Sequence, residues 1–176
     1  MYKKCKVLEK VFSDLGYTLS NPVSHTHGHG PLKGEKMKIS ARNLLAGTVQ
    51  KVTKGAVNAE VALTLKGGET VIAIITNSSV ESLGLAEGKA AFAIVKASEV
   101  IIGKGVDGSK LSARNVLAGE VSAVHDGAVN SEVDIKLPGG TIVASSITKE
   151  SVKNLELKIG DKVSAIVKSS NVMVGV

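Results

Sequence analysis

Apolar and polar positions alternate over much of the chain beyond residue 38, and this pattern predicts short β-strands joined by tight turns. In residues 57–65, Val61, Leu63 and Leu65 point to one side of a strand and the residues between them point to the other, as expected for a strand with one buried face. Gly67-Gly68 then predicts a hairpin. Residues 71–75 form a more continuous apolar run, which we expect to be covered on both faces.

A single helical turn interrupts these strands. Residues 79–83 follow Thr76, whose hydroxyl suits the N-cap of a short helix. After a turn at Gly88, we expect residues 91–95 and 100–102 to complete the same sheet. Five or so short strands with one helical turn predict an all-β fold, a small OB-like β-barrel.

The whole pattern occurs twice, with an offset of 72 residues that holds to the C-terminus without a gap. About half of the paired positions are identical. Two copies this similar in length predict two tandem barrels of one fold, residues 38–104 and 110–176, joined by a short linker near residues 103–109.

Residues 1–37 do not share the repeated pattern. Apolar residues recur at steps of three and four over residues 3–15, which predicts a short amphipathic helix. Its apolar face would pack on the repeats or dock a protein partner. Residues 18–37 contain turn-forming pairs and no periodicity, which indicates a linker.

Three histidines lie in this linker, His25, His27 and His29. In an extended segment their imidazoles would share one face, and histidine is a common ligand of zinc, copper and nickel. No cysteine or carboxylate is close by in sequence, so a plain polar linker is the alternative interpretation.

Composition narrows the class of protein. The single cysteine, Cys5, excludes a disulfide framework and favours a cytoplasmic location. No apolar stretch approaches the length of about eighteen residues that a membrane-spanning helix needs. The formal net charge is +6, but residues 1–38 hold seven lysines against three acidic residues. Since the repeats carry little excess charge and almost no aromatic residues for base stacking, we expect no nucleic-acid binding by them.

The candidate chemistry begins with the only two arginines, Arg42 and Arg114, which stand in a repeated Ser-Ala-Arg-Asn motif. A guanidinium is a planar, permanently charged set of donors that suits an oxyanion. Several other polar positions shared by the repeats are also donors, and a lysine at the end of a buried strand is costly unless it is paired. The shared set is Ser40, Arg42, Thr76, Ser79 and Lys96 with Ser112, Arg114, Thr148, Ser151 and Lys168.

A pocket made only of donors favours an oxyanion that carries no proton at neutral pH. Molybdate, tungstate and sulfate meet this condition, whereas the proton of hydrogen phosphate needs an acceptor. The sequence contains no P-loop, nucleophile elbow or dinucleotide-binding fingerprint, and we expect binding rather than catalysis. Glu60 and Glu132 could act as bases. More simply, they lie on the solvent face or at a subunit contact, and in a purely structural alternative the arginines bridge subunits through them.

At this level of detail the repeats resemble the molybdenum-pterin-binding (Mop) domain. The resemblance is carried by Ser-Ala-Arg-Asn-x-Leu-x-Gly-x-Val, Gly-Ala-Val-Asn-x-Glu-Val, Gly-Gly, Ile-Thr-x-x-Ser-Val and Val-Lys-x-Ser-x-Val. The tandem arrangement is similar to that of the di-Mop molbindins. The resemblance implies OB-like barrels, a homotrimer of tandem domains, and molybdate or tungstate as the ligand between domains, with no redox cofactor.

The resemblance also implies particular site residues. Each site would combine one Ser-Ala-Arg motif and its lysine with the Thr-x-x-Ser-Val turn of a neighbouring domain. Asn58 and Asn130 would be weaker candidates for further anion sites on the threefold axis. The implied sets are Ser40, Ala41, Arg42 and Lys96 with Thr76, Ser79 and Val80, and Ser112, Ala113, Arg114 and Lys168 with Thr148, Ser151 and Val152.

These observations lead to one functional hypothesis and one rival. We expect an intracellular molybdate- or tungstate-binding protein that serves molybdenum storage or homeostasis. The rival is a molybdate-sensing regulatory module that acts through a protein partner. Residues 1–37 lie outside the Mop pattern and are too short for the winged-helix DNA-binding domain of molybdate-responsive regulators.

Overall fold

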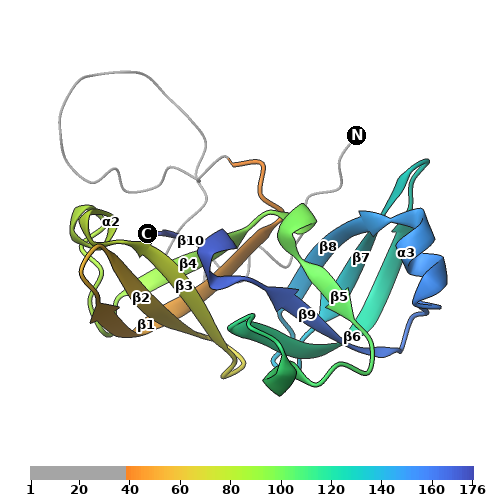
Figure 1. Ribbon diagram of the computed structural model, residues 1–176, viewed down its shortest axis with the longest axis horizontal. Coiled ribbons are helices and arrows are strands. Elements are labelled where there is room, and N and C mark those ends of the chain that lie inside the picture. The colour runs from red at the N-terminus through yellow and green to blue at the C-terminus, as the bar shows by residue number, and fades with distance from the viewer. Residues whose placement is uncertain (1–38) are drawn as a thin grey trace, which may run out of the picture. The chain divides into compact units, whose positions relative to one another are not determined.

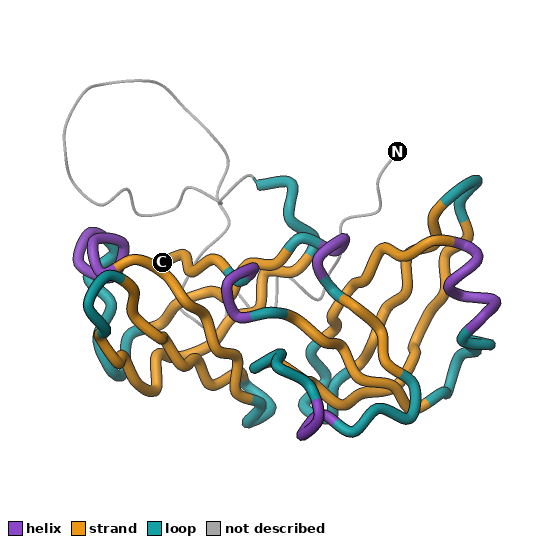
Figure 2. Tube along the Cα trace, viewed as in Figure 1, coloured by secondary structure: helices purple, strands orange, loops and turns teal. Residues whose placement is uncertain are grey.

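The computed structural model describes residues 39–176, and in this range the strands form two five-stranded antiparallel sheets of one design. The strand order is β10-β4-β1-β2-β3 in one sheet and β5-β9-β6-β7-β8 in the other. Figure 1 shows the two sheets and Figure 2 the short helical turns that connect strands. The helix predicted for residues 3–15 and the three histidines of the linker fall outside the described residues.

Both repeats carry the same succession of elements. The first consists of β1 (Asn43–Lys54), β2 (Asn58–Leu65), β3 (Thr70–Thr76), α2 (Asn77–Ser82), β4 (Ala90–Val95), η1 (Ala97–Glu99) and β5 (Ile101–Gly103). A short turn, η2 (Gly108–Lys110), leads into the second, which consists of β6 (Asn115–Asp126), β7 (Asn130–Lys136), β8 (Ile142–Thr148), α3 (Lys149–Asn154), β9 (Lys162–Val167), η3 (Ser169–Asn171) and β10 (Met173–Gly175).

The predicted alternation and the predicted helix cap are confirmed. Val61, Leu63 and Leu65 of β2 are buried, and the residues between them are partly exposed. Helix α2 begins after Thr76, whose Oγ1 accepts a hydrogen bond from the Ser79 N–H at 3.1 Å. Because these signals are local, they could be recognised without knowing the tertiary structure.

The prediction that residues 71–75 are covered on both faces is wrong. This run forms β3, an edge strand of its sheet. Val71 and Ala73 are buried, but Ile74 remains 37% exposed on the other face. An apolar run alone does not distinguish a doubly covered strand from an edge strand.

The last strand of each repeat completes the sheet of the other repeat, which corrects the expectation that residues 100–102 close their own sheet. Strand β5 pairs with β9, with Ile102 opposite Ala165, and β10 pairs with β4, with Val174 opposite Ala93. In Figure 1 the end of the chain, β10, lies beside β4 in the sheet of the first repeat. Neither repeat therefore forms a complete five-stranded sheet from its own residues.

Each sheet curls around an aliphatic core. The edge strands β3 and β10 of the first sheet come into contact, as do β8 and β5 of the second, and this curvature is consistent with an OB-like barrel. The core residues are almost all Val, Leu, Ile and Ala, in agreement with the scarcity of aromatic residues in the repeats. Among the described residues no helix is long and apolar enough to cross a membrane.

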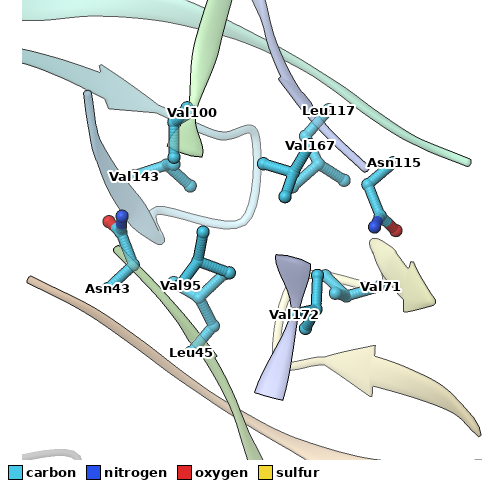
Figure 3. A pocket seen from close by; sticks show the side chains of 10 residues that line it. All are labelled: Asn43, Leu45, Val71, Val95, Val100, Asn115, Leu117, Val143, Val167 and Val172. Carbon is cyan, nitrogen blue, oxygen red and sulfur yellow. The ribbon is translucent and has the colours of Figure 1, made fainter. Parts of the chain in front are cut away.

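The two sheets are related by an approximate twofold axis, because residues at the axis contact their own equivalents. The Asn171 side chain donates a hydrogen bond to Glu99, 72 positions earlier. A small cavity of about 10 Å³ lies between the sheets and is lined by five pairs of equivalent residues. Figure 3 shows its apolar lining, with Asn43 and Asn115 on opposite sides. The pairs are Asn43 and Asn115, Leu45 and Leu117, Val71 and Val143, Val95 and Val167, and Val100 and Val172.

The two Gly-Gly hairpins also meet at this axis, and their contact predicts a sensitive position. A Cβ added to Gly139 would lie 2.1 Å from the Gly67 Cα, so backbone would have to move. We expect Gly139→Ala to lower the free energy of unfolding by about 1–3 kcal/mol, measured by chemical denaturation. Pro138→Ala, at an exposed position in the same turn, is the control and should change stability much less.

Lys104 attaches the chain segment after β5 to the second repeat. Its Nζ donates to the carbonyl oxygens of Leu155 and Glu156 at 3.3 and 3.1 Å and contacts Asp161 Oδ2 at 2.9 Å. The hydrogen bond from Lys104, followed by that from the Lys158 N–H, lowers the pKa of Asp161 below its ordinary value of 3.8. A lysine of the connection thus anchors the exchanged strand at one end.

This interaction predicts an acid-sensitive contribution to stability. Because the folded-state pKa of Asp161 lies below its unfolded-state value, the contribution is complete above pH 3.8 and is lost as the pH falls through the folded-state pKa. We expect the thermal midpoint of the wild type to exceed that of Asp161→Asn near neutral pH, and the difference to shrink below pH 3.8. A difference that stays constant over this range would contradict the assignment.

Candidate functional site

Two buried asparagines place the repeated Ser-Ala-Arg-Asn motifs. Asn43 is 2% exposed, and its side-chain amide donates to the Ala144 carbonyl at 2.9 Å and accepts from the Ala144 N–H at 2.7 Å. Asn115 makes the same pair of bonds with Ile72, at 2.9 and 2.7 Å. Each amide therefore satisfies backbone groups of an edge strand, β8 or β3, in the other repeat.

This role of the asparagines was not predicted. The sequence did contain a signal, because both motifs end in an asparagine at the start of an apolar strand. An amide buried there needs hydrogen-bond partners. The partners are backbone groups of residues roughly 100 positions away in one case, and sequence spacing does not identify them.

Each arginine forms an ion pair with a glutamate of the opposite repeat. Arg42 Nη1 lies 2.7 Å from Glu132 Oε1. Arg114 contacts both oxygens of Glu60, at 3.0 Å from Nη1 to Oε2 and 3.2 Å from Nη2 to Oε1. The expectation that no acceptor accompanies the arginines is therefore wrong. The predicted bridges through Glu60 and Glu132 are present, but they link the repeats of one chain.

The two lysines lie next to the arginines but are not buried. In the pairing of β1 with β4, Asn43 is opposite Val95, so the next position along each strand brings Lys96 beside Arg42. Lys168 has the same relation to Arg114, since Asn115 is opposite Val167. Both lysines are exposed at the ends of buried strands, so the expected burial penalty does not apply to them. Their ammonium groups are accessible to an anion from solvent.

The hydroxyl groups form two small clusters at the starts of the helical turns. Thr76 Oγ1 is 2.8 Å from Ser79 Oγ and 2.9 Å from Ser78 Oγ. Thr148 Oγ1 lies 2.8 Å from Ser151 Oγ, and it accepts from the Ser151 N–H at 3.0 Å. In these clusters the Ser N–H groups are already bonded to the threonine cap, and the hydroxyls are the groups that can turn toward a ligand.

The remaining predicted positions differ in accessibility. Val80 is 3% exposed, so its side chain belongs to the core and only its backbone could touch a ligand. Val152 is partly buried. Asn58 and Asn130 are exposed at the first positions of β2 and β7. Among the described residues no group of three His, Cys, Asp or Glu side chains could hold a metal ion.

The strand register indicates which repeat faces each motif. Asn43 bonds to Ala144, and Arg42 contacts Glu132, which lies opposite Ser146 in the pairing of β7 with β8. Two positions farther along the two strands, Asn130 is opposite Thr148, so the first motif runs along β8 toward the helical turn of the second repeat. By the equivalent contacts of Asn115 and Arg114, the second motif runs along β3 toward Thr76.

In this structure the Ser-Ala-Arg motif and lysine of each predicted site are not joined directly to the hydroxyl groups of the opposite repeat. Within residues 39–176, Ser40, Arg42 and Lys96 form no hydrogen bond with Thr148 or Ser151. In the same part of the chain, the only charged group in ion-pair contact with either arginine is its glutamate. Each motif thus offers one guanidinium and one ammonium beside one carboxylate, an arrangement with a net positive charge that suits an anion.

Comparison with known proteins is consistent with this arrangement. The TOBE domain matches residues 39–102 and 111–174, which covers most of both repeats. The chain is 44% identical over 140 residues to the molybdenum transport protein ModE of Azotobacter vinelandii, covering 80% of this chain and 52% of that protein. It is 42% identical over 137 residues to the molybdenum-pterin-binding protein MopA of Rhodobacter capsulatus, covering 78% and 52%. The chain thus spans about half the length of these relatives.

A solved structure shares the architecture. The structure of the cytoplasmic molybdate-binding protein ModG with molybdate bound superimposes with a TM-score of 0.77 at 50% sequence identity, covering 80% of this chain and 99% of that one. The domain match, the relatives and the solved structure confirm the resemblance that the repeated motifs indicated. The chain belongs to the TOBE-domain family, as a tandem pair of Mop-type domains.

Proposed function

We propose that this protein binds molybdate, and tungstate by the same chemistry, at two equivalent sites in each chain. Each site would take its cations from one repeat and its hydroxyls from the other, as the strand register indicates. The first consists of Ser40, Ala41, Arg42 and Lys96 with Thr148, Ser151 and Val152, and the second of Ser112, Ala113, Arg114 and Lys168 with Thr76, Ser79 and Val80.

The single observation that carries the proposal is the exposed guanidinium at the boundary between the repeats, beside a lysine, in both copies. An arginine and a lysine supply charge-assisted hydrogen bonds to an oxyanion, and these are about twice as strong as neutral ones. The molybdate-bound structure of ModG, half of whose residues are identical over the aligned region, supports molybdate as the ligand. The hydroxyls would add donors without adding charge.

Isothermal titration of the purified chain with molybdate, tungstate, sulfate and phosphate tests this proposal. We expect binding of molybdate and tungstate and weaker binding of hydrogen phosphate, because the carboxylate that could accept its proton is already paired with the arginine. Equal affinity for all four anions, or no binding of molybdate, would contradict the proposed function.

We further propose a cytoplasmic homotrimer in which the axial positions include Asn58 and Asn130. Supporting this, Val57 and Val129 are 71% and 75% exposed at equivalent hairpin tips, one residue before these asparagines. Apolar side chains exposed in the same place in both repeats favour contact with other chains. The mass of the protein in solution, measured by sedimentation with and without molybdate, tests the assembly.

Storage or homeostasis of molybdenum is the role we favour, because the proposed sites hold an anion without a nucleophile beside it. A sensing module that acts through a protein partner is the second candidate, and the amphipathic pattern of residues 3–15, which would suit such a partner, favours it. Affinity capture with and without molybdate separates the two roles, since only a sensor gains or loses a partner with the ligand.

A further inference from the structure

The two glutamates that hold the arginines stand at equivalent positions of the repeats, and they are less exposed than the arginines. The side chains of Glu132 and Glu60 are 25% and 33% exposed, whereas those of Arg42 and Arg114 are 64% and 56% exposed. Each carboxylate stands on the third residue of a strand, β7 or β2, and each guanidinium is more than half exposed to solvent. An anion can therefore approach the arginine without first moving the glutamate's strand.

We propose that Glu132 and Glu60 are built-in competitors of the oxyanion. Each pairs with its arginine when no oxyanion is bound, and this competition sets the affinity of the site for the oxyanion. This inference rests on the proposed function and assigns specificity-determining residues to it. A bound dianion and the carboxylate would lie within a few ångströms of the same guanidinium, and like charges at that distance repel. The carboxylate consequently has to give way to the anion, and part of the binding free energy is used to displace it.

The ion pairs are not needed to hold the repeats together. The buried amides of Asn43 and Asn115 and the exchanged strands β5 and β10 already make that connection. Ion pairs as exposed as these contribute little to stability, because solvent screens them. Their presence at both equivalent positions is explained better by an effect on the arginine than by an effect on the fold.

Competition with the carboxylate also makes binding depend on the charge of the anion. Every anion must displace the same carboxylate, but a monoanion gains less than a dianion from the arginine and the lysine. Monoanions of similar shape would therefore bind too weakly to compete, although the arginine alone would accept them. The glutamates thereby favour divalent oxyanions such as molybdate over monovalent ones.

Glu132→Gln and Glu60→Gln test the inference, because glutamine keeps an acceptor for the arginine and removes only the charge. We expect each variant to bind molybdate about two- to fivefold more tightly at one site, and to gain measurable binding of perrhenate, a tetrahedral monoanion. Glu120→Gln is the matched control, since Glu120, six positions along the chain from Arg114, pairs with Lys162 away from the hydroxyl clusters, and it should bind both anions like the wild type.

The results separate this inference from the function on which it rests. A wild-type chain that binds no molybdate contradicts the proposed function. A wild-type chain that binds molybdate, with both glutamine variants binding it equally well or more weakly, overturns the competitor role and assigns the glutamates to orienting the arginines. Circular dichroism of each variant verifies folding, and the two variants report independently, so a variant that fails to fold leaves the other to decide.

Discussion

Arg42→Ala is expected to abolish molybdate binding at one of the two sites in each chain and to leave the other site intact. The variant removes the guanidinium and its charge-assisted hydrogen bonds, each worth about 1.5–3 kcal/mol. It also leaves Glu132 without its cation, so an unpaired carboxylate repels the incoming dianion. Together these effects predict a loss of affinity of about 100-fold or more at that site, measured by isothermal titration.

The second arginine provides the internal comparison. Arg114→Ala should remove the other site to a similar extent, and the double variant should lose both. Lys51→Ala removes an exposed cation from β1 and controls for the general effect of charge. If Arg42→Ala bound as much molybdate as the wild type with unchanged affinity, the arginine would have only a structural role between the repeats.

Removing residues 173–176 is expected to destabilise the first repeat more than the second, although these residues end the second. The truncation deletes β10, which pairs with β4 through Met173, Val174 and Gly175. It removes backbone hydrogen bonds and the partly buried Val174, and it opens the edge of β4. We expect the free energy of unfolding to fall by about 3 kcal/mol or more.

Hydrogen exchange locates this effect. Faster exchange in the truncated protein should be concentrated in β4 and β1 of the first sheet, while β9 keeps its protection because β5 remains beside it. Removing only Val176, which is 48% exposed, is the control and should change little. Faster exchange confined to β9 and β6 would contradict the exchange of strands.

Local features of the fold were predictable from the sequence because their causes are local. The threonine cap at Thr76, the alternation in β2 and the Gly-Gly hairpin each depend on residues within a few positions. The offset of 72 residues then predicted that both repeats share one fold. For the site, the repeated motif identified the two arginines, which the structure places in contact with the opposite repeat. The hydroxyl positions lie at the starts of the helical turns, where they bond within their own turn.

The contacts between the two repeats were not predictable. Because the repeats are duplicates, a residue could meet its partner in its own repeat or the equivalent residue in the other repeat. Residues 100–102 could join either sheet, because the strands available to them, β4 and β9, both end in Ala-Ile-Val. The contact of Arg42 with Glu132, instead of a residue of its own repeat, follows from the same choice. Periodicity shows which face a residue occupies but does not show which copy it meets.

The exchange of β5 and β10 also determines what a single cut in the chain would produce. A break between β5 and β6 yields two fragments, each of which keeps four strands of its own sheet and carries the fifth strand of the other. Neither fragment can satisfy its open sheet edge alone, and each holds the piece that the other lacks. The connection between the repeats therefore acts as a tether that keeps two complementary halves at high local concentration, and not as a hinge between independent domains.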